Sequence, residues 1–172
     1  MKKKLSQPRL IALLVLGISV TALAGAFIAQ YAFGLYPCKL CIYQRWPFVV
    51  TGLAGIALFF FSNALKKAAY LEFIAGIVFL ANAALALFHS GVERKYWEGL
   101  EGCGAPDMTG SVAEILERIK NAPVARCDEI PWADPLFGLS MANYNVLLCL
   151  LSFLLCITAS LYTMRKANGY LN

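Results

Sequence analysis

The sequence predicts an all-α membrane protein, an antiparallel bundle of four transmembrane helices with one long outer loop that carries a short amphipathic helix. Composition is the first observation behind this prediction. Of the 172 residues, 60% are hydrophobic and only 15% are charged, whereas soluble domains usually carry about 25% charged residues. The second observation is that the apolar residues gather in four long runs, and a helix needs about 20 mostly apolar residues to cross a bilayer.

The four runs are expected to form helices, because backbone polar groups in lipid must find partners within their own segment. The second run is short unless it begins near Cys41. Gly34 and Pro37 are expected to end the first helix before the first cysteine pair. We read the chain as a single membrane domain, 1–172, with spans at about 10–33, 43–62, 68–89 and 141–164 and outer loops at about 34–42 and 90–140.

The distribution of charge predicts the orientation of the spans. The N-terminal tail holds four bases and no acid, the short turn between the second and third runs holds Lys66 and Lys67, and the C-terminal tail holds Arg165 and Lys166. The long loop has five bases against nine acids. Because cytoplasmic flanks collect Lys and Arg, both termini are predicted to be cytoplasmic and both large loops to face outward. The net charge of +5 forms no basic stripe with interleaved aromatics, so nucleic-acid binding is not expected.

Two other interpretations of the apolar runs, a cleaved signal peptide and a small transporter, fit the sequence less well. The basic tail and first apolar run could be a cleaved signal peptide, with a cleavage site at Ala22-Leu23-Ala24. That run continues to Phe33, however, well beyond the usual 7–15 residues of a signal peptide. A small transporter is disfavoured by the scarcity of charge inside the spans, where Glu72 and Asn82 are the obvious polar residues of the third run.

The long outer loop contains one clear helix signal. Ser111 and Glu114 have the spacing of a capping box, in which each side chain bonds the backbone N–H of the other residue. Apolar residues then recur at helical spacing, at Val112, Ile115, Leu116 and Ile119. This pattern predicts a short amphipathic helix, which either packs on the loop itself or lies on the membrane surface.

Four of the six cysteines are predicted to face the outer side, where disulfides persist; they are Cys38, Cys41, Cys103 and Cys127. Cys149 and Cys156 fall within the fourth span. Seven residues of helix separate them by about 10 Å, which is too far for a disulfide. We interpret these two as small apolar packing residues.

Cys38-Lys39-Leu40-Cys41 is a C-x-x-C motif, a setting that can lower a thiol pKa and produce a reactive thiolate. Its short loop gives a disulfide only about 2 kcal/mol of stabilisation, against about 3.5 for a bond between Cys103 and Cys127. Proximity favours these two pairs, although four cysteines allow three pairings, and two inert structural disulfides are the alternative. No metal site is expected, because four-cysteine zinc sites usually carry a second C-x-x-C.

Arg45 and His89 are the candidate partners of the C-x-x-C motif. Arg45 follows Cys41 by four residues and therefore shares its helical face, where its charge would favour the Cys41 thiolate and bind a carbonyl oxygen of an electron acceptor. An arginine that snorkels to lipid headgroups is the alternative. His89 ends the third span on the outer side, a position where a lone histidine is more often structural. The tryptophans are read as interfacial anchors: Trp46, Trp97 and Trp132.

The stretch Pro37-Cys38-Lys39-Leu40-Cys41-Ile42-Tyr43-Gln44-Arg45 resembles the first-loop signature of the disulfide-bond formation protein B (DsbB) family. Two later stretches agree with the segment that enters the family's last helix, Cys127-Asp128-Glu129-Ile130-Pro131-Trp132 and Phe137-Gly138-Leu139-Ser140-Met141. Four spans and two outer cysteine pairs in the same order extend the resemblance over most of the chain. Gln44 stands where the family sometimes has an acid.

The resemblance implies a bacterial inner-membrane enzyme, a protein-thiol:quinone oxidoreductase whose cysteine loops are periplasmic. A reduced DsbA-like thioredoxin-fold oxidase would attack Cys103, in a mobile loop that can meet a soluble partner, and Cys127 would be the thiol that is released. Cys127 would then exchange with Cys38. Cys41 would face a membrane quinone, ubiquinone or menaquinone, which Arg45 and His89 would help to bind. The alternative is a non-enzymatic membrane protein whose outer loops are held by structural disulfides.

Overall fold

The computed structural model describes residues 7–101, 103–104, 108–121 and 124–170. Five helices form in this part of the chain: α1 (Gln7–Ala32), α2 (Lys39–Phe61), α3 (Leu65–Glu93), α4 (Val112–Asn121) and α5 (Met141–Ala167). Four of them, all but α4, are long and apolar enough to cross a membrane. The predicted class, an all-helical four-helix membrane bundle, is confirmed, and the described residues contain no strand beyond one isolated bridge between Ala133 and Ser140.

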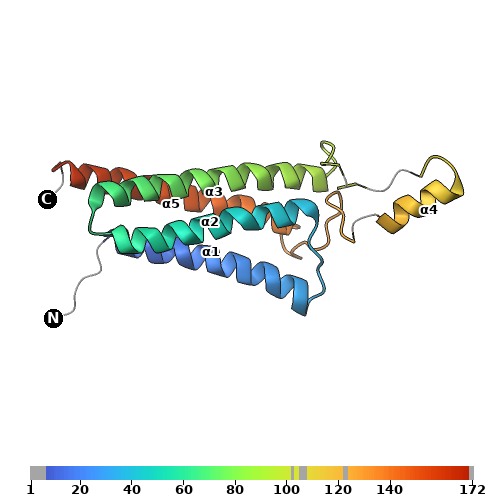
Figure 1. Cartoon of the computed structure of the whole chain (residues 1–172), viewed down its shortest axis with the longest axis horizontal. Helices are drawn as coiled ribbons and strands as arrows, with labels where there is room; N and C mark the ends of the chain where they lie inside the picture. The colour runs from blue at the N-terminus through green and yellow to red at the C-terminus, as the bar shows by residue number, and fades with distance from the viewer. Residues whose placement is uncertain (1–6, 102, 105–107, 122–123, 171–172) are drawn as a thin grey trace.

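The four long helices run side by side (Figure 1), with α3 packed most extensively on α5 and α2 packed on both α1 and α3. The start of α1 and the end of α5 lie at one end of the bundle (Figure 1), which we call the terminal end. The links from α1 to α2 and from α3 to α5 lie at the opposite end (Figure 1), which we call the cysteine end. This arrangement brings the start of α2, the end of α3 and the start of α5 together.

Small residues let the helices approach closely, as is usual where lipid supplies no hydrophobic force between helices. A Cβ atom on Gly55 of α2 would lie 3.1 Å from the backbone nitrogen of Leu16 in α1. A Cβ atom on Gly76 of α3 would lie 3.2 Å from the Cβ atom of Cys156 in α5. Large apolar side chains instead face outward along the spans, as Leu53 and Leu151 do at 62% and 66% exposure.

The helix α2 begins at Lys39, four residues before the predicted start of the second span. Cys38 is its N-cap residue, and the Cys38 sulfur accepts a hydrogen bond from the backbone N–H of Cys41 at 3.3 Å. This cap satisfies one of the amide groups that the first turn leaves without a helical partner. Cys41 therefore lies in the first turn of a helix and not in the loop. Upstream, α1 ends at Ala32, and Gly34 follows with a φ of +67°.

Polar contacts fix the start of α5 against the end of α3. The Ser140 hydroxyl donates to the Glu93 carboxylate at 2.5 Å, and the Asn143 amide donates to the Ser90 hydroxyl at 2.6 Å. Ser140 and Asn143 also form the capping box of α5. These four side chains therefore join the end of α3 to the start of α5.

The amphipathic helix predicted in the long loop is α4, and its capping box is confirmed. The Ser111 N–H donates to the Glu114 carboxylate at 2.9 Å, and the Glu114 N–H donates to the Ser111 hydroxyl at 3.4 Å. The helix projects beyond the cysteine end of the bundle (Figure 1). Its apolar side chains are exposed, Val112 by 84% and Leu116 by 51%, so α4 does not bury this face against its own loop.

Candidate functional site

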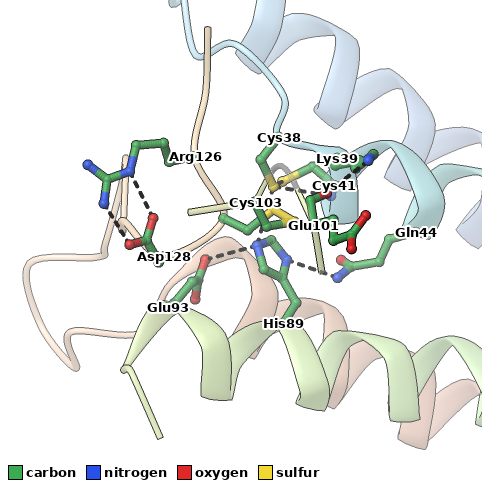
Figure 2. Close-up of a disulfide and its surroundings, with 11 residues drawn as sticks. Cys38, Lys39, Cys41, Gln44, His89, Glu93, Glu101, Cys103, Arg126 and Asp128 are labelled. Atoms are coloured by element: carbon green, nitrogen blue, oxygen red, sulfur yellow. Dashed lines mark hydrogen bonds and ion pairs between the residues drawn. A yellow bond between two sulfur atoms is a disulfide. The ribbon is translucent and has the colours of Figure 1, made fainter. Parts of the chain in front are cut away.

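Cys38 and Cys41 meet His89 at the cysteine end of the bundle (Figure 2). The two sulfur atoms lie 3.1 Å apart, and the Cys38 sulfur lies 3.4 Å from Nε2 of His89. Both thiols are free. The first turn of α2 supplies the cysteines and the last turns of α3 supply the histidine, so the tight packing of these two helices creates the contact.

The surroundings of Cys38 favour its thiolate. The pKa of Cys38 is lowered from 9.0 to about 4, and the largest cause is the hydrogen bond with the Cys41 thiol. Burial opposes this shift, and the hydrogen bond with His89 adds to it. Cys38 is 4% exposed, so its charge depends on these contacts and not on water.

Cys103 and Cys127 form a disulfide with a Cα–Cα distance of 4.9 Å, as proximity suggested. The Cys127 N–H also donates to the Cys103 carbonyl at 2.8 Å. The disulfide packs into one apolar cluster with Cys38, Leu40 and Val92, against which Cys41 also lies. The structure therefore brings all four loop cysteines together (Figure 2).

The disulfide is buried in this structure, because Cys103 and Cys127 are both 0% exposed. The segment after α3 folds back onto that helix, and its Gly99 lies next to Cys103. The Trp97 indole donates to the Phe88 carbonyl at 2.9 Å, stacks on the Phe88 ring and occupies the space where Gly91 lacks a side chain.

A cavity of about 480 Å³ opens beside the covered disulfide. Its wall includes Cys103, Gly104 and Asp128 together with residues 95–99. Gly99 is close to the disulfide, since a Cβ atom there would lie 2.9 Å from the Cβ atom of Cys103. The cavity is therefore an approach toward Cys103 from outside the bundle.

A network of ion pairs flanks Cys127. Arg126 donates to both carboxylate oxygens of Asp128, at 2.9 and 2.6 Å, and pairs with Glu129 at 2.8 Å. The Arg126 guanidinium lowers the pKa of Asp128. The charge of Arg126 is therefore satisfied by carboxylates. Figure 2 shows Arg126 and Asp128 to one side of the disulfide.

A second, larger cavity of about 570 Å³ lies among α1, α2, α3 and α5. Alanine, leucine and aromatic side chains form most of its wall. Its polar lining comes from the cysteine end and comprises Cys41, Gln44, Arg45, His89, Glu93 and Asn145. Cys41 is therefore both the hydrogen-bond donor to Cys38 and part of the wall of an apolar cavity.

Arg45 lines this cavity but does not make the expected pairing with Cys41. Its guanidinium donates to Oε1 of Gln30 at 2.8 Å and lies 5.0 Å from the centre of the Phe27 ring. Both partners belong to α1, because α1 packs along the face of α2 that carries Arg45. The charge is thus fixed on the cavity wall, and His89 is the residue that contacts a sulfur.

His89 is 3% exposed and is held on both ring nitrogens. Its Nδ1 lies 3.0 Å from Nε2 of Gln44, and its Nε2 lies 3.8 Å from Glu93 as well as near Cys38. Sequence reasoning missed Glu93 and Asn145. The signal available was the presence of polar residues at the ends of long apolar runs, but helical spacing alone did not show which of them converge.

The three donors Cys38, Cys41 and His89 also satisfy the distances of a metal site, since their ligand atoms all lie within 4.8 Å of one another. The sequence argument against zinc considered only cysteines and missed the histidine. A metal ion would require both thiols as thiolates and an unprotonated Nε2.

Comparisons with known proteins agree with this geometry. Residues 8–159 match the family model described as "Disulfide bond formation protein DsbB". A protein of Rickettsia prowazekii named "Uncharacterized protein RP370" is 31% identical over 83% of both chains. Proteins named "Disulfide bond formation protein B" are 31% identical in Aromatoleum aromaticum, over 81% of this chain and 82% of the relative, and 25% identical in Acinetobacter baumannii, over 87% and 88%. No solved structure matches the chain.

Proposed function

This chain belongs to the DsbB family, and from that premise we propose that it reoxidises a DsbA-like thiol oxidase and passes the electrons to a membrane quinone. Family membership makes it a disulfide-forming membrane oxidoreductase. The observation that carries the finer proposal is the position of the Cys38/Cys41 pair. It packs against the Cys103–Cys127 disulfide on one side, and Cys41 lines the large apolar cavity on the other.

The proposed exchange begins at the outer disulfide, with Cys38 and Cys41 oxidised to a disulfide. A thiolate of the reduced partner attacks Cys103, and the Cys103–Cys127 bond breaks with Cys127 leaving as a thiolate. Cys127 then attacks Cys38, which breaks the Cys38–Cys41 bond and releases Cys41 as a thiolate. The partner's second thiolate attacks the partner's sulfur in the mixed disulfide with Cys103. This attack completes the partner's own disulfide and releases Cys103 as a thiolate.

Cys103 closes the exchange by attacking Cys127. This step restores the Cys103–Cys127 bond and releases Cys38 as a thiolate. The partner has then lost two electrons and two protons, and the electrons reside on the Cys38/Cys41 dithiol. The low pKa of Cys38 supports this order, because a thiol with a lower pKa is a better leaving group.

The large cavity fits a quinone headgroup. Its volume of about 570 Å³ lies within the usual range for small-molecule sites, and its apolar wall with a few donors at one end suits a flat ring with two carbonyl oxygens. Arg45 would hold one carbonyl oxygen, positioned by Gln30 and Phe27, and His89 lies in the same wall. A bound quinone, ubiquinone or menaquinone, supplies an acceptor for two electrons and two protons.

The partner would approach through the cavity beside Cys103. This cavity supports an attack on Cys103 in preference to Cys127, since it is lined by Cys103 and not by Cys127. In this proposal the segment that carries Trp97 moves aside to expose the sulfur. The partner would be a soluble thioredoxin-fold protein, and no nucleic acid takes part.

We further propose that the chain is a single inner-membrane domain with its cysteine end in the periplasm and both termini in the cytoplasm. The bases of the terminal end support this orientation. Lys66 and Lys67 lie in the first turn of α3, and Arg165 and Lys166 lie in the last turn of α5; both of these helix ends lie at the terminal end (Figure 1), and cytoplasmic flanks collect such residues.

The test is quinone reduction by the purified full-length protein, supplied with a reduced thioredoxin-fold oxidase and a soluble quinone analogue. Cys41→Ser should abolish reduction, and Cys103→Ala should abolish the covalent complex with the partner. Cys156→Ala is the matched control, because Cys156 is as buried as Cys103 but lies in the core of the bundle. Quinone reduction that survives Cys41→Ser would refute the electron path, and disulfides that stay oxidised with or without quinone would favour the non-enzymatic alternative.

A further inference from the structure

His89 is the only histidine of the chain, and a chain of hydrogen bonds reaches it from α5. Asn145 of α5 donates from Nδ2 to Oε1 of Gln44 at 2.8 Å. Nε2 of Gln44, on α2, lies 3.0 Å from Nδ1 of His89, on α3. Nε2 of His89 in turn lies 3.4 Å from the sulfur of Cys38. These four side chains are therefore connected in one line: three belong to the helices α5, α2 and α3, and the fourth belongs to the N-cap residue of α2.

The direction of these hydrogen bonds is fixed by the chemistry of the side-chain amides. An amide has an oxygen that only accepts and a nitrogen that only donates. Because Asn145 donates to the oxygen of Gln44, the nitrogen of Gln44 faces His89 and donates to Nδ1. A neutral imidazole carries one proton, so a ring whose Nδ1 accepts must carry that proton on Nε2.

Asn145 is itself held in this orientation. Its Oδ1 accepts a hydrogen bond from the Cys149 thiol at 3.3 Å, and the Cys149 sulfur accepts from Nδ2 of Asn82 at 3.4 Å. Asn82 also donates to the backbone carbonyl of Gln44 at 3.3 Å. In the series from Asn82 through Cys149 and Asn145 to Gln44, each side chain donates a hydrogen bond to the next. Cys149 therefore has a polar role in addition to packing.

We infer that Gln44 and Asn145 are positioning residues that hold His89 as the tautomer with its proton on Nε2, so that the ring donates a hydrogen bond to the sulfur of Cys38. In the opposite tautomer a lone pair on Nε2 would face the sulfur and repel its thiolate. The other ionisable groups at this ring are Cys41 from α2 and Glu93 from α3, and Glu93 lies farther from Nε2, at 3.8 Å, while accepting from Ser140.

The inference rests on the proposed function for its consequence. Cys38 is released as a thiolate when Cys103 attacks Cys127, and a neutral ring that donates to this sulfur stabilises the leaving group. The residue at position 44 then decides the state of the ring. A glutamate there would accept from Nδ1–H and so reverse the tautomer or hold the ring as a cation.

The test is ¹⁵N NMR of the full-length protein in detergent micelles at pH 7, with the single histidine labelled. In the native chain we expect a pyridine-type signal for Nδ1 and a pyrrole-type signal for Nε2. Gln44→Leu and Asn145→Leu should each produce a mixture of tautomers, and Gln44→Glu should protonate Nδ1. Ser152→Ala is the matched control, because Ser152 is buried in α5 and its hydroxyl donates to the Leu148 carbonyl of the same helix.

A native ring protonated on Nδ1, alone or together with Nε2, would overturn the inference, as would a tautomer that is unchanged in both leucine variants. Asn145→Leu keeps the test valid if Gln44→Leu does not fold, because Asn145 acts on the histidine through its hydrogen bond to Gln44. The measurement needs no turnover, so its failure leaves the proposed quinone reduction standing, and loss of the proposed activity leaves the tautomer result standing.

Discussion

Replacing His89 with leucine should raise the pKa of Cys38 by a measurable and limited amount. The change removes the Nε2 contact at 3.4 Å but leaves the Cys41 thiol, which is the main cause of the low pKa. A hydrogen bond to a charged group contributes about 1.5–3 kcal/mol, and one pKa unit corresponds to about 1.4 kcal/mol. The pKa of Cys38 should therefore rise by about one to two units from its value of about 4 and stay below 9.0.

The same free energy should appear in the redox potential of the Cys38/Cys41 pair. Losing about 1.5–3 kcal/mol of stabilisation in the reduced form lowers a two-electron potential by roughly 30–65 mV. Thiolate absorbance of the reduced protein, corrected with Cys38→Ser, measures the pKa, and equilibration with glutathione buffers measures the potential. His89→Gln is the matched control, because its amide can still donate to the sulfur and should recover part of both shifts. A titration of Cys38 that is the same in the native protein and in His89→Leu would refute the reasoning.

Three further predictions follow from the site. With the Cys38/Cys41 pair reduced, thermal stability should rise as pH increases from about 4 to 9. The pKa of Cys38 is lower in the folded protein than in the unfolded chain, so the unfolded chain binds one more proton in this window. Thermal melting of the protein with an oxidised pair, which cannot titrate, should lack this rise, and identical pH profiles for the two forms would contradict the pKa shift. Gly91→Ala should displace Trp97 from α3 and speed the reduction of the Cys103–Cys127 bond by dithiothreitol. Gly17→Ala, at a position with open space around it, should leave the reduction rate unchanged. Equal reduction rates in the native protein and in Gly91→Ala would mean that Trp97 does not cover the disulfide. Arg45→Leu should raise the apparent KM for quinone by about 10- to 150-fold, which corresponds to the loss of one charged hydrogen bond. Arg9→Leu removes similar contacts to Ser62 and Phe59 at the terminal end and should leave the KM unchanged. Equal KM values in the two variants would exclude Arg45 from the quinone site.

The sequence determined the features that depend on local pattern. The length and hydropathy of the four runs predicted the spans, because the thickness of the bilayer sets the length of a helix that crosses it. The spacing of Ser111 and Glu114 predicted the cap of α4, because both partners lie within one turn. The C-x-x-C motif predicted a close thiol pair for the same reason.

The tertiary structure decided what depends on how the helices are rotated against each other. Arg45 shares a helical face with Cys41, yet the packing of α1 draws its guanidinium to Gln30. His89, separated from Cys38 by 51 positions, reaches the sulfur because α3 packs against the start of α2. Contacts between distant residues follow from helix crossings and side-chain rotamers, which the period of a single helix does not encode.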